Sequence, residues 1–84
     1  MNDVRRKELK HAIDLIQEAM DIINSVRDEE HQSLNNLPES IMYGKQGSMM
    51  SDIVDSLEDQ YIASFRIVDS LYDLIIVNNN SVSE

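Results

Sequence analysis

IVDSLEDQYIASFRIVDSL, residues 53–71, begins and ends with the same five residues, and the second copy starts fourteen positions after the first. Fourteen residues are two heptads, so the repeat places Val54 and Val68 at one helix position and Leu57 and Leu71 at another. Apolar residues continue these alternating three- and four-residue steps beyond both copies. The repeat therefore indicates the register of one long amphipathic helix, and by itself it implies no site.

Two long helices are predicted from this spacing. The second covers about 48–77 and starts with Ser48, a good N-cap. The first covers about 4–35, where Asn2 or Asp3 can cap the start and the same alternating steps recur. The residues expected to line the core or a dimer interface are Ile13, Ile16, Met20, Ile23, Val54, Leu57, Tyr61, Val68, Leu71 and Ile75.

The segment 36–47 is predicted to be a structured elbow between the helices. Pro38 lacks the N–H that a helix interior needs and disfavours helical geometry at the preceding residue, so the first helix should end close to Asn35. Proline is tolerated at the first position of a helix, so a short helical turn can start at Pro38. Residues 78–84 are expected to form a frayed tail, with Asn78 as C-cap.

The fold class expected is all-α, a single domain over residues 1–84 in which two helices form a long antiparallel hairpin. At 100° per residue, the apolar side chains span roughly 180° of the first helix and roughly 200° of the second. One antiparallel neighbour covers about 100°, so an apolar flank stays open on each helix. We expect a second copy to cover it, which gives a homodimeric four-helix bundle. An elbow folded back over the flank and a different protein partner are the alternatives.

The chain is strongly acidic, with sixteen acidic and seven basic residues and a net charge of −9. Residues 1–10 hold four bases and two acids, which leaves +2 there and −11 on residues 11–84. A phosphate-binding surface needs a basic stripe, so we expect no direct binding of nucleic acid. The basic cluster is expected beside the end of the second helix, near Asp69 and Asp73, where the helix dipole favours cations. A functional basic patch, retained on DNA at low salt, is the alternative.

The acidic side chains on both helices permit a sharper hypothesis. Spread along two long helices, they can imitate the phosphates of a nucleic acid and occupy the basic groove of an enzyme that binds one. An ordinary solubilising surface is the simpler interpretation. The residues concerned are Asp14, Glu18, Asp21, Asp28, Glu29, Glu30, Asp52, Asp55, Glu58, Asp59, Asp69 and Asp73.

No catalytic or cofactor-binding constellation is recognisable in the sequence. His11 and His31 are twenty residues apart and lack the helical companions of a metal site. The four residues of DEEH, 28–31, point in different directions around a helix, so they cannot converge on a cation. We expect neither an enzyme nor a cofactor. Arg27 and Glu30 occupy seam positions, where a polar layer that fixes the register of the helices is the better-attested role, and an opening of the seam is the alternative.

The cellular setting is constrained by two further features. The chain contains no cysteine, which fits a reducing compartment. It has neither a secretory signal pattern nor an apolar run of about 18 residues, so we expect no membrane span. These features favour the cytoplasm.

The elbow contains three consecutive apolar or amphipathic residues, 41–43, where polar residues are usual. They can cover the open end of the core, or they can form a knob that binds a partner, since Tyr and Met suit interfaces. Met49 and Met50 have the same two interpretations. The candidate partner-binding residues are Ile41, Met42, Tyr43, Asp52, Asp55, Glu58 and Asp59.

The stretch RDEEHQSLNNLPES, residues 27–40, followed by Gly47 and then Met49, resembles small acidic helical proteins encoded by bacteriophages and prophages. In those proteins a long helix ends in an Asn-Leu-Pro-Glu-Ser elbow, and a glycine and then a methionine open a second helix. The match is carried by residues 36–40 with the glycine and methionine, whereas residues 41–46 depart from it, because the family is polar and charged there. The resemblance implies a viral or mobile-element origin, and it transfers no activity.

Two functional hypotheses follow. The first is a non-catalytic protein-binding module, a phage-encoded inhibitor of a host defence or nucleic-acid-processing protein such as a nuclease, acting in the cytoplasm of an infected or lysogenic bacterium. The second is a structural or scaffolding coiled-coil protein that associates with itself. They differ in whether the elbow and the acidic surface are dispensable, and in whether the chain captures a protein other than itself.

Overall fold

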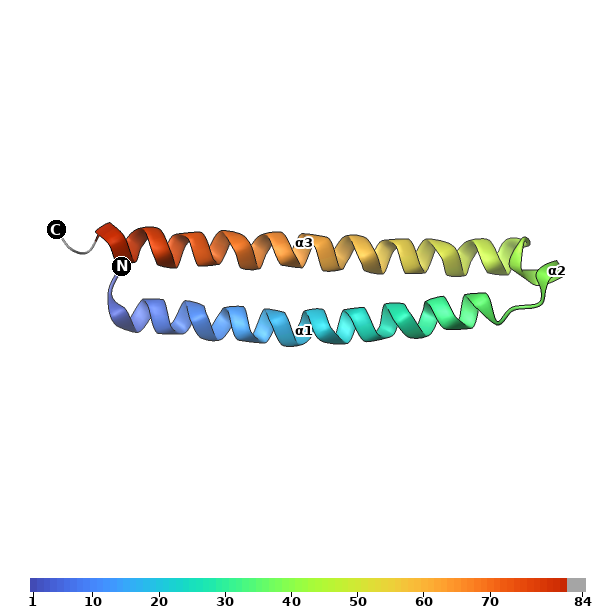
Figure 1. The fold of residues 1–84 in the computed structure, drawn as a ribbon, viewed down its shortest axis with the longest axis horizontal. Helices are drawn as coiled ribbons and strands as arrows, with labels where there is room; N and C mark the ends of the chain where they lie inside the picture. The colour runs from blue at the N-terminus through green and yellow to red at the C-terminus, as the bar shows by residue number, and fades with distance from the viewer. Residues whose placement is uncertain (82–84) are drawn as a thin grey trace.

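A computed structural model describes residues 1–81, with side chains described through residue 76, and this part of the chain is all-α. Three helices follow one another: α1 (Asp3–Asn35), α2 (Glu39–Met42) and α3 (Lys45–Ser81). The two long helices lie side by side and antiparallel, and the short α2 makes the turn at one end (Figure 1). The molecule measures 66 × 15 × 12 Å. The predicted long helical hairpin is confirmed.

The first helix begins and ends where its local sequence favours it. The side chain of Asn2 accepts a hydrogen bond from the backbone N–H of Arg5 at 2.9 Å, so one of the two predicted caps is in place. At the other end, the N–H of Asn36 still donates to the carbonyl of Gln32, and the helix stops there. Pro38 follows with φ −56° and ψ 146°, and α2 starts directly after it. The short helical turn predicted at this proline is therefore present.

The start of α3 differs from the prediction. The helix begins at Lys45, three residues before the predicted cap Ser48, whose N–H already donates to the Gly44 carbonyl at 3.1 Å. Gly47 therefore lies in the first turns of the helix and not in a loose connection ahead of it. A Cβ at Gly47 would lie 1.8 Å from the carbonyl oxygen of Met42, so only glycine lets α2 approach α3 this closely.

The other end of α3 also differs from the prediction. The helix continues to Ser81, so Asn78 lies inside it and is not its C-cap. No glycine or proline follows Gly47 in the sequence, so no strong helix breaker interrupts the hydrogen bonds of this helix. The structure thus corrects the predicted tail at residues 78–81, whereas residues 82–84 lie outside the described part of the chain.

The core is one seam of side chains between α1 and α3. Of the ten residues predicted to line it, Ile13, Met20, Val68 and Ile75 are buried and the other six are half-buried. Leu9 packs against the same cluster. Two helices enclose side chains only along the line where they touch, so a single hairpin buries few residues fully.

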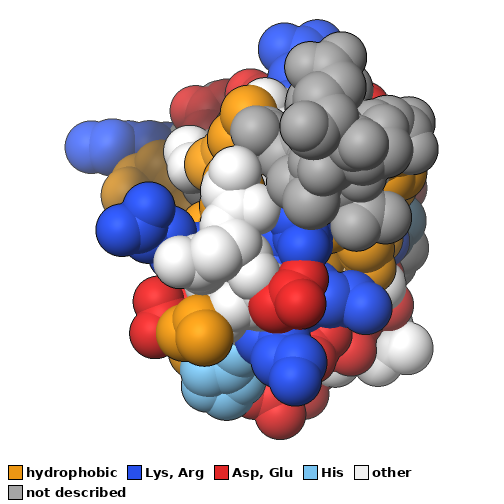
Figure 2. All heavy atoms as spheres, turned by 90° about the vertical axis from the view of Figure 1, so that its left-hand side faces the viewer, with side chains coloured by type: hydrophobic (Ala, Val, Ile, Leu, Met, Phe, Trp, Pro, Cys, Tyr) orange, Lys and Arg blue, Asp and Glu red, His pale blue; other side chains and the backbone are white. Residues whose placement is uncertain are grey.

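The basic cluster lies at the end of the hairpin where α1 begins, and Figure 2 shows Lys and Arg side chains around that end with acidic ones among them. Arg6 pairs with Asp3 in its own helix. The cluster borders α3 at Ile75, as expected from the antiparallel arrangement. In the described part of the chain, however, no ion pair joins it to Asp69 or Asp73. The cluster thus lies beside the C-terminal part of α3, as expected, and within the described residues it makes no direct ion pair to either carboxylate.

Candidate functional site

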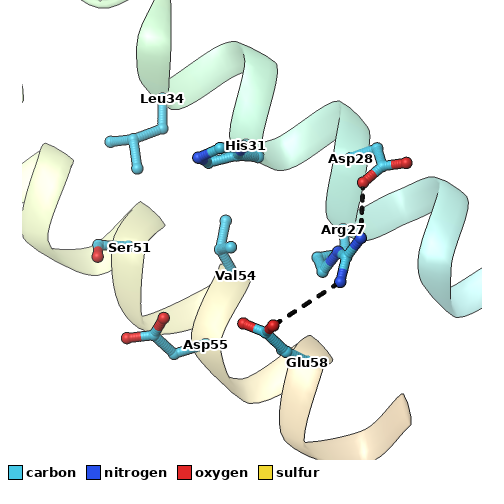
Figure 3. Close-up of a pocket in the computed structure, with 8 residues that line it drawn as sticks. All are labelled: Arg27, Asp28, His31, Leu34, Ser51, Val54, Asp55 and Glu58. Carbon is cyan, nitrogen blue, oxygen red and sulfur yellow. Dashed lines mark hydrogen bonds and ion pairs between the residues drawn. The ribbon is translucent and has the colours of Figure 1, made fainter.

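An open groove of about 350 Å³ lies between the two long helices at the level of Arg27 (Figure 3). Arg27 Nη2 lies 3.0 Å from Asp28 Oδ1, and Arg27 Nη1 lies 3.9 Å from Glu58 Oε1 on α3. The side chains of His31 and Val54 project into the space between the helices beside this ion pair. The seam residue Arg27 thus has an acidic partner on the facing helix, and the pair joins the two helices at this level.

The ion pair in the groove is partly open to solvent. The side chains of Arg27 and Glu58 are 28% and 54% exposed, so water screens their attraction. The hydroxyl of Ser51 borders the groove and is hydrogen-bonded to no general base among the described residues. Within the same residues, no three His, Asp or Glu side chains gather closely enough to hold a metal ion. The groove is therefore a surface feature that another macromolecule can contact.

The acidic residues of α3 form an exposed row, which we call the acidic ridge. Asp52, Asp55 and Asp59 are separated by three and four residues and so share one side of the helix. All three are exposed, and in the described part of the chain none of them pairs with a base, whereas Glu58 pairs with Arg27. At 1.5 Å per residue the ridge extends for roughly 30 Å along α3. Its members are Asp52, Asp55, Glu58, Asp59, Asp69 and Asp73.

The three candidate residues of the elbow are not equivalent. Tyr43 is 82% exposed and Ile41 is also exposed, whereas Met42 is half-buried. A cavity of about 380 Å³ lies where α1, the elbow and α3 meet, and Met42, Tyr43 and Asp52 all border it. Met42 is thus the least accessible of the three, and its role in covering the end of the seam stays a prediction. Tyr43 and Ile41 remain exposed, and Tyr43 borders the same cavity as Asp52, the first carboxylate of the acidic ridge.

The apolar arc predicted for α3 is divided by the seam into two exposed surfaces. Phe65 is exposed on the side where it borders a groove with Asp21 of α1. Ile53 and Ile67 are exposed as well, and their helix positions place them on the other side of the seam. This division could have been read from the sequence, because the residue before a seam position and the residue after it lie on opposite sides of the seam.

No family model, no curated protein and no solved structure matches this chain. The resemblance to phage and prophage hairpins therefore stays a prediction that depends on the elbow residues. Over the described residues, neither long helix contains a stretch apolar enough to cross a bilayer.

Proposed function

We propose that this protein is a non-catalytic binding module that docks onto another protein through the acidic ridge and the elbow. The observation that supports this is their adjacency, because Tyr43 and Asp52 border the same cavity. An exposed aromatic side chain thus stands beside an exposed row of carboxylates. Tyrosine is enriched at binding hot spots, and charges around such an anchor select the partner and accelerate the encounter with it.

The chemistry of the ridge favours a partner with a basic groove. Side chains three and four residues apart on a helix are about 5–6 Å apart, so the part of the ridge from Asp52 to Asp59 presents closely spaced negative charge, as a short nucleic-acid strand does. Asp69 and Asp73 form a second acidic group beyond Arg66. A host protein that processes nucleic acid, such as a nuclease used in defence, offers a groove of this charge. In the viral setting that the elbow motif implies, this protein would inhibit its target by occupying that groove.

The proposal is tested by capture from bacterial lysate followed by competition. The tagged wild-type chain is compared with a ridge variant, Asp52→Asn with Asp55→Asn and Asp59→Asn, which leaves the Arg27–Glu58 pair intact. We expect the wild type to retain a nucleic-acid-binding protein that duplex DNA displaces. We expect the ridge variant to lose at least nine-tenths of this capture, because three steering charges are absent.

A matched control removes the same charge from α1, through Asp14→Asn, Glu18→Gln and Asp21→Asn. These three residues are exposed, so the control has the same net charge as the ridge variant but keeps the ridge. If this control captures as much of the nucleic-acid-binding protein as the wild type does, the result supports binding through the ridge itself. Equal losses in both variants would mean that bulk charge alone is responsible, and recovery of nothing but the chain itself would favour the structural alternative.

A further inference from the structure

A second line of positions accompanies the buried seam on both long helices. On α3 each of its members precedes a seam residue by one position, and it comprises Met49, Ile53, Ser56, Gln60, Ala63, Ile67, Ser70 and Leu74. On α1 the same step back from the seam gives Ala12, Leu15, Ala19, Ile22 and Val26, and toward the two ends of the helix it gives Glu8 and Glu29. Apart from these two glutamates the line is uncharged, although the chain as a whole carries −9, and the thirteen uncharged residues occupy its middle.

The two lines lie on the same side of the hairpin. Because α1 and α3 run in opposite directions, one step back along each helix turns toward the same side. One step forward leads to the opposite side, where Asp28, Asp55 and Glu58 border a common groove. We call the uncharged side the neutral face. It is exposed, since Leu15, Ile22 and Ile67 each keep more than half of their surface accessible.

The repeated pentapeptide encodes this division of the surface. In each copy of IVDSL, the Val and Leu occupy seam positions that are buried or half-buried, as Val68 and Leu71 do. The Ile and Ser, for example Ile67 and Ser70, belong to the neutral face, and the Asp lies on the charged side. The repeat therefore specifies an apolar seam and, beside it, an uncharged line that contains Ile53 and Ile67, and the hairpin covers only the seam.

We propose that the neutral face binds the neutral face of a second copy of this chain, with the two hairpins antiparallel about a two-fold axis near Ala19 and Ala63. This interaction is separate from the docking of a target through the acidic ridge, so either can exist without the other. In a two-fold interface the same patch contributes from both chains, and an uncharged apolar face is complementary to itself. Ala19 and Ala63 lie at the midpoints of α1 and α3, where small side chains allow close approach of the helices.

The exposed surface supports a second copy as the occupant. The chain exposes 6306 Å², whereas a compact folded chain of 9.7 kDa exposes about 5,100 Å². The excess of about 1,200 Å² is larger than the roughly 800 Å² that each partner buries in a stable interface of standard size. Two chains that each carry −9 also repel each other least across the side with the fewest charges, where only Glu8 and Glu29 lie near the ends of α1.

The charge distribution selects the antiparallel orientation. Residues 27–59, the elbow half, contain two bases and eight acids and so carry −6, whereas the other residues contain five bases and eight acids and carry −3. Parallel hairpins would place the two −6 halves together. Antiparallel hairpins place each elbow half beside the less acidic half of the partner, which has the basic cluster at its end, and this lowers the repulsion.

A matched pair of substitutions on α3 tests the proposal. Ile67→Glu places a charge on the neutral face, and Ile62→Glu places the same charge outside it, five residues away and at similar exposure (53% and 46%). In sedimentation velocity we expect Ile67→Glu to raise the dissociation constant of the dimer at least a hundredfold, because the symmetry buries two unpaired carboxylates. We expect Ile62→Glu to leave it within about threefold. A folded monomeric wild type, or equal effects of the two substitutions, would overturn the proposal.

Two further measurements cover the case in which Ile67→Glu unfolds the chain. The thermal midpoint of the wild type must rise with protein concentration, because only association links stability to concentration. A spin label at Ser40→Cys, the sole cysteine, reports the orientation: the antiparallel dimer predicts an elbow-to-elbow separation close to the 66 Å length of the hairpin. A separation of about 10–20 Å, near the spacing of neighbouring helices, would contradict the orientation.

Discussion

Replacing Ile13 by alanine is expected to remove a large part of the stability of the hairpin. Ile13 is 1% exposed, the most deeply buried large side chain among the described residues, and it belongs to the cluster with Met20, Val68 and Ile75. Truncating a buried isoleucine costs about 2–5 kcal/mol, and we expect about 3 kcal/mol here, because a molecule only two helices thick can collapse partly around the cavity. A loss of about 3 kcal/mol lowers the folding equilibrium constant by about two orders of magnitude. It is a large share of the roughly 4–13 kcal/mol free energy of unfolding that is typical of a chain of this length.

The assay is urea denaturation followed by circular dichroism at one fixed chain concentration, with the slope of the transition compared between variants. Ile62→Ala is the control, because it truncates the same residue type at a position on α3 that is 46% exposed. It should lower the free energy of unfolding by less than about 0.5 kcal/mol. A cost under about 1 kcal/mol for Ile13→Ala, or equal costs for the two variants, would refute the assignment of Ile13 to the core.

Three further predictions concern the helix ends and the ion pair. Gly47→Ala should destabilise the hairpin by at least about 2 kcal/mol in urea denaturation, because the new Cβ would lie 1.8 Å from the Met42 carbonyl oxygen. Gly44→Ala is the control: its Cβ would lie 3.4 Å from the nearest atom, so the free energy of unfolding should change by less than about 1 kcal/mol. Equal effects of the two substitutions would contradict this packing. Asn2→Ala should cost about 1 kcal/mol and increase amide exchange in the first turn of α1, and unchanged exchange would argue against the cap. A double-mutant cycle on Arg27 and Glu58 should give a coupling energy below about 1 kcal/mol that shrinks with added salt, since the pair is 3.9 Å apart and partly exposed; a larger, salt-independent coupling would contradict this.

The two helices and their contact line were predictable because heptad spacing is a local pattern that repeats many times. Ile13 and Val68, for example, are placed by their neighbours three and four residues away, and both are buried. The start of α3 was not predictable in this way. Gly47 resembles a helix breaker in sequence, and its role inside the helix depends on its distance from Met42, which only the folded elbow determines.

The candidate surfaces were predictable to a similar extent. The exposure of Asp52 and Asp55 follows from their helix positions, but the placement of Tyr43 beside Asp52 depends on α2, a single turn whose direction no periodic pattern specifies. Likewise, Arg27 was recognisable as a polar seam residue, whereas its partner Glu58 depends on the register between the two helices.

The most direct test of the central claim, that the hairpin exposes an apolar face which a second copy covers, is sedimentation equilibrium of the wild-type chain up to about 200 µM with helicity measured in parallel. The account predicts a mass twice the 9.7 kDa of one chain, with helix content that falls when dilution separates the copies. A fully helical species of 9.7 kDa at the highest concentration would contradict it.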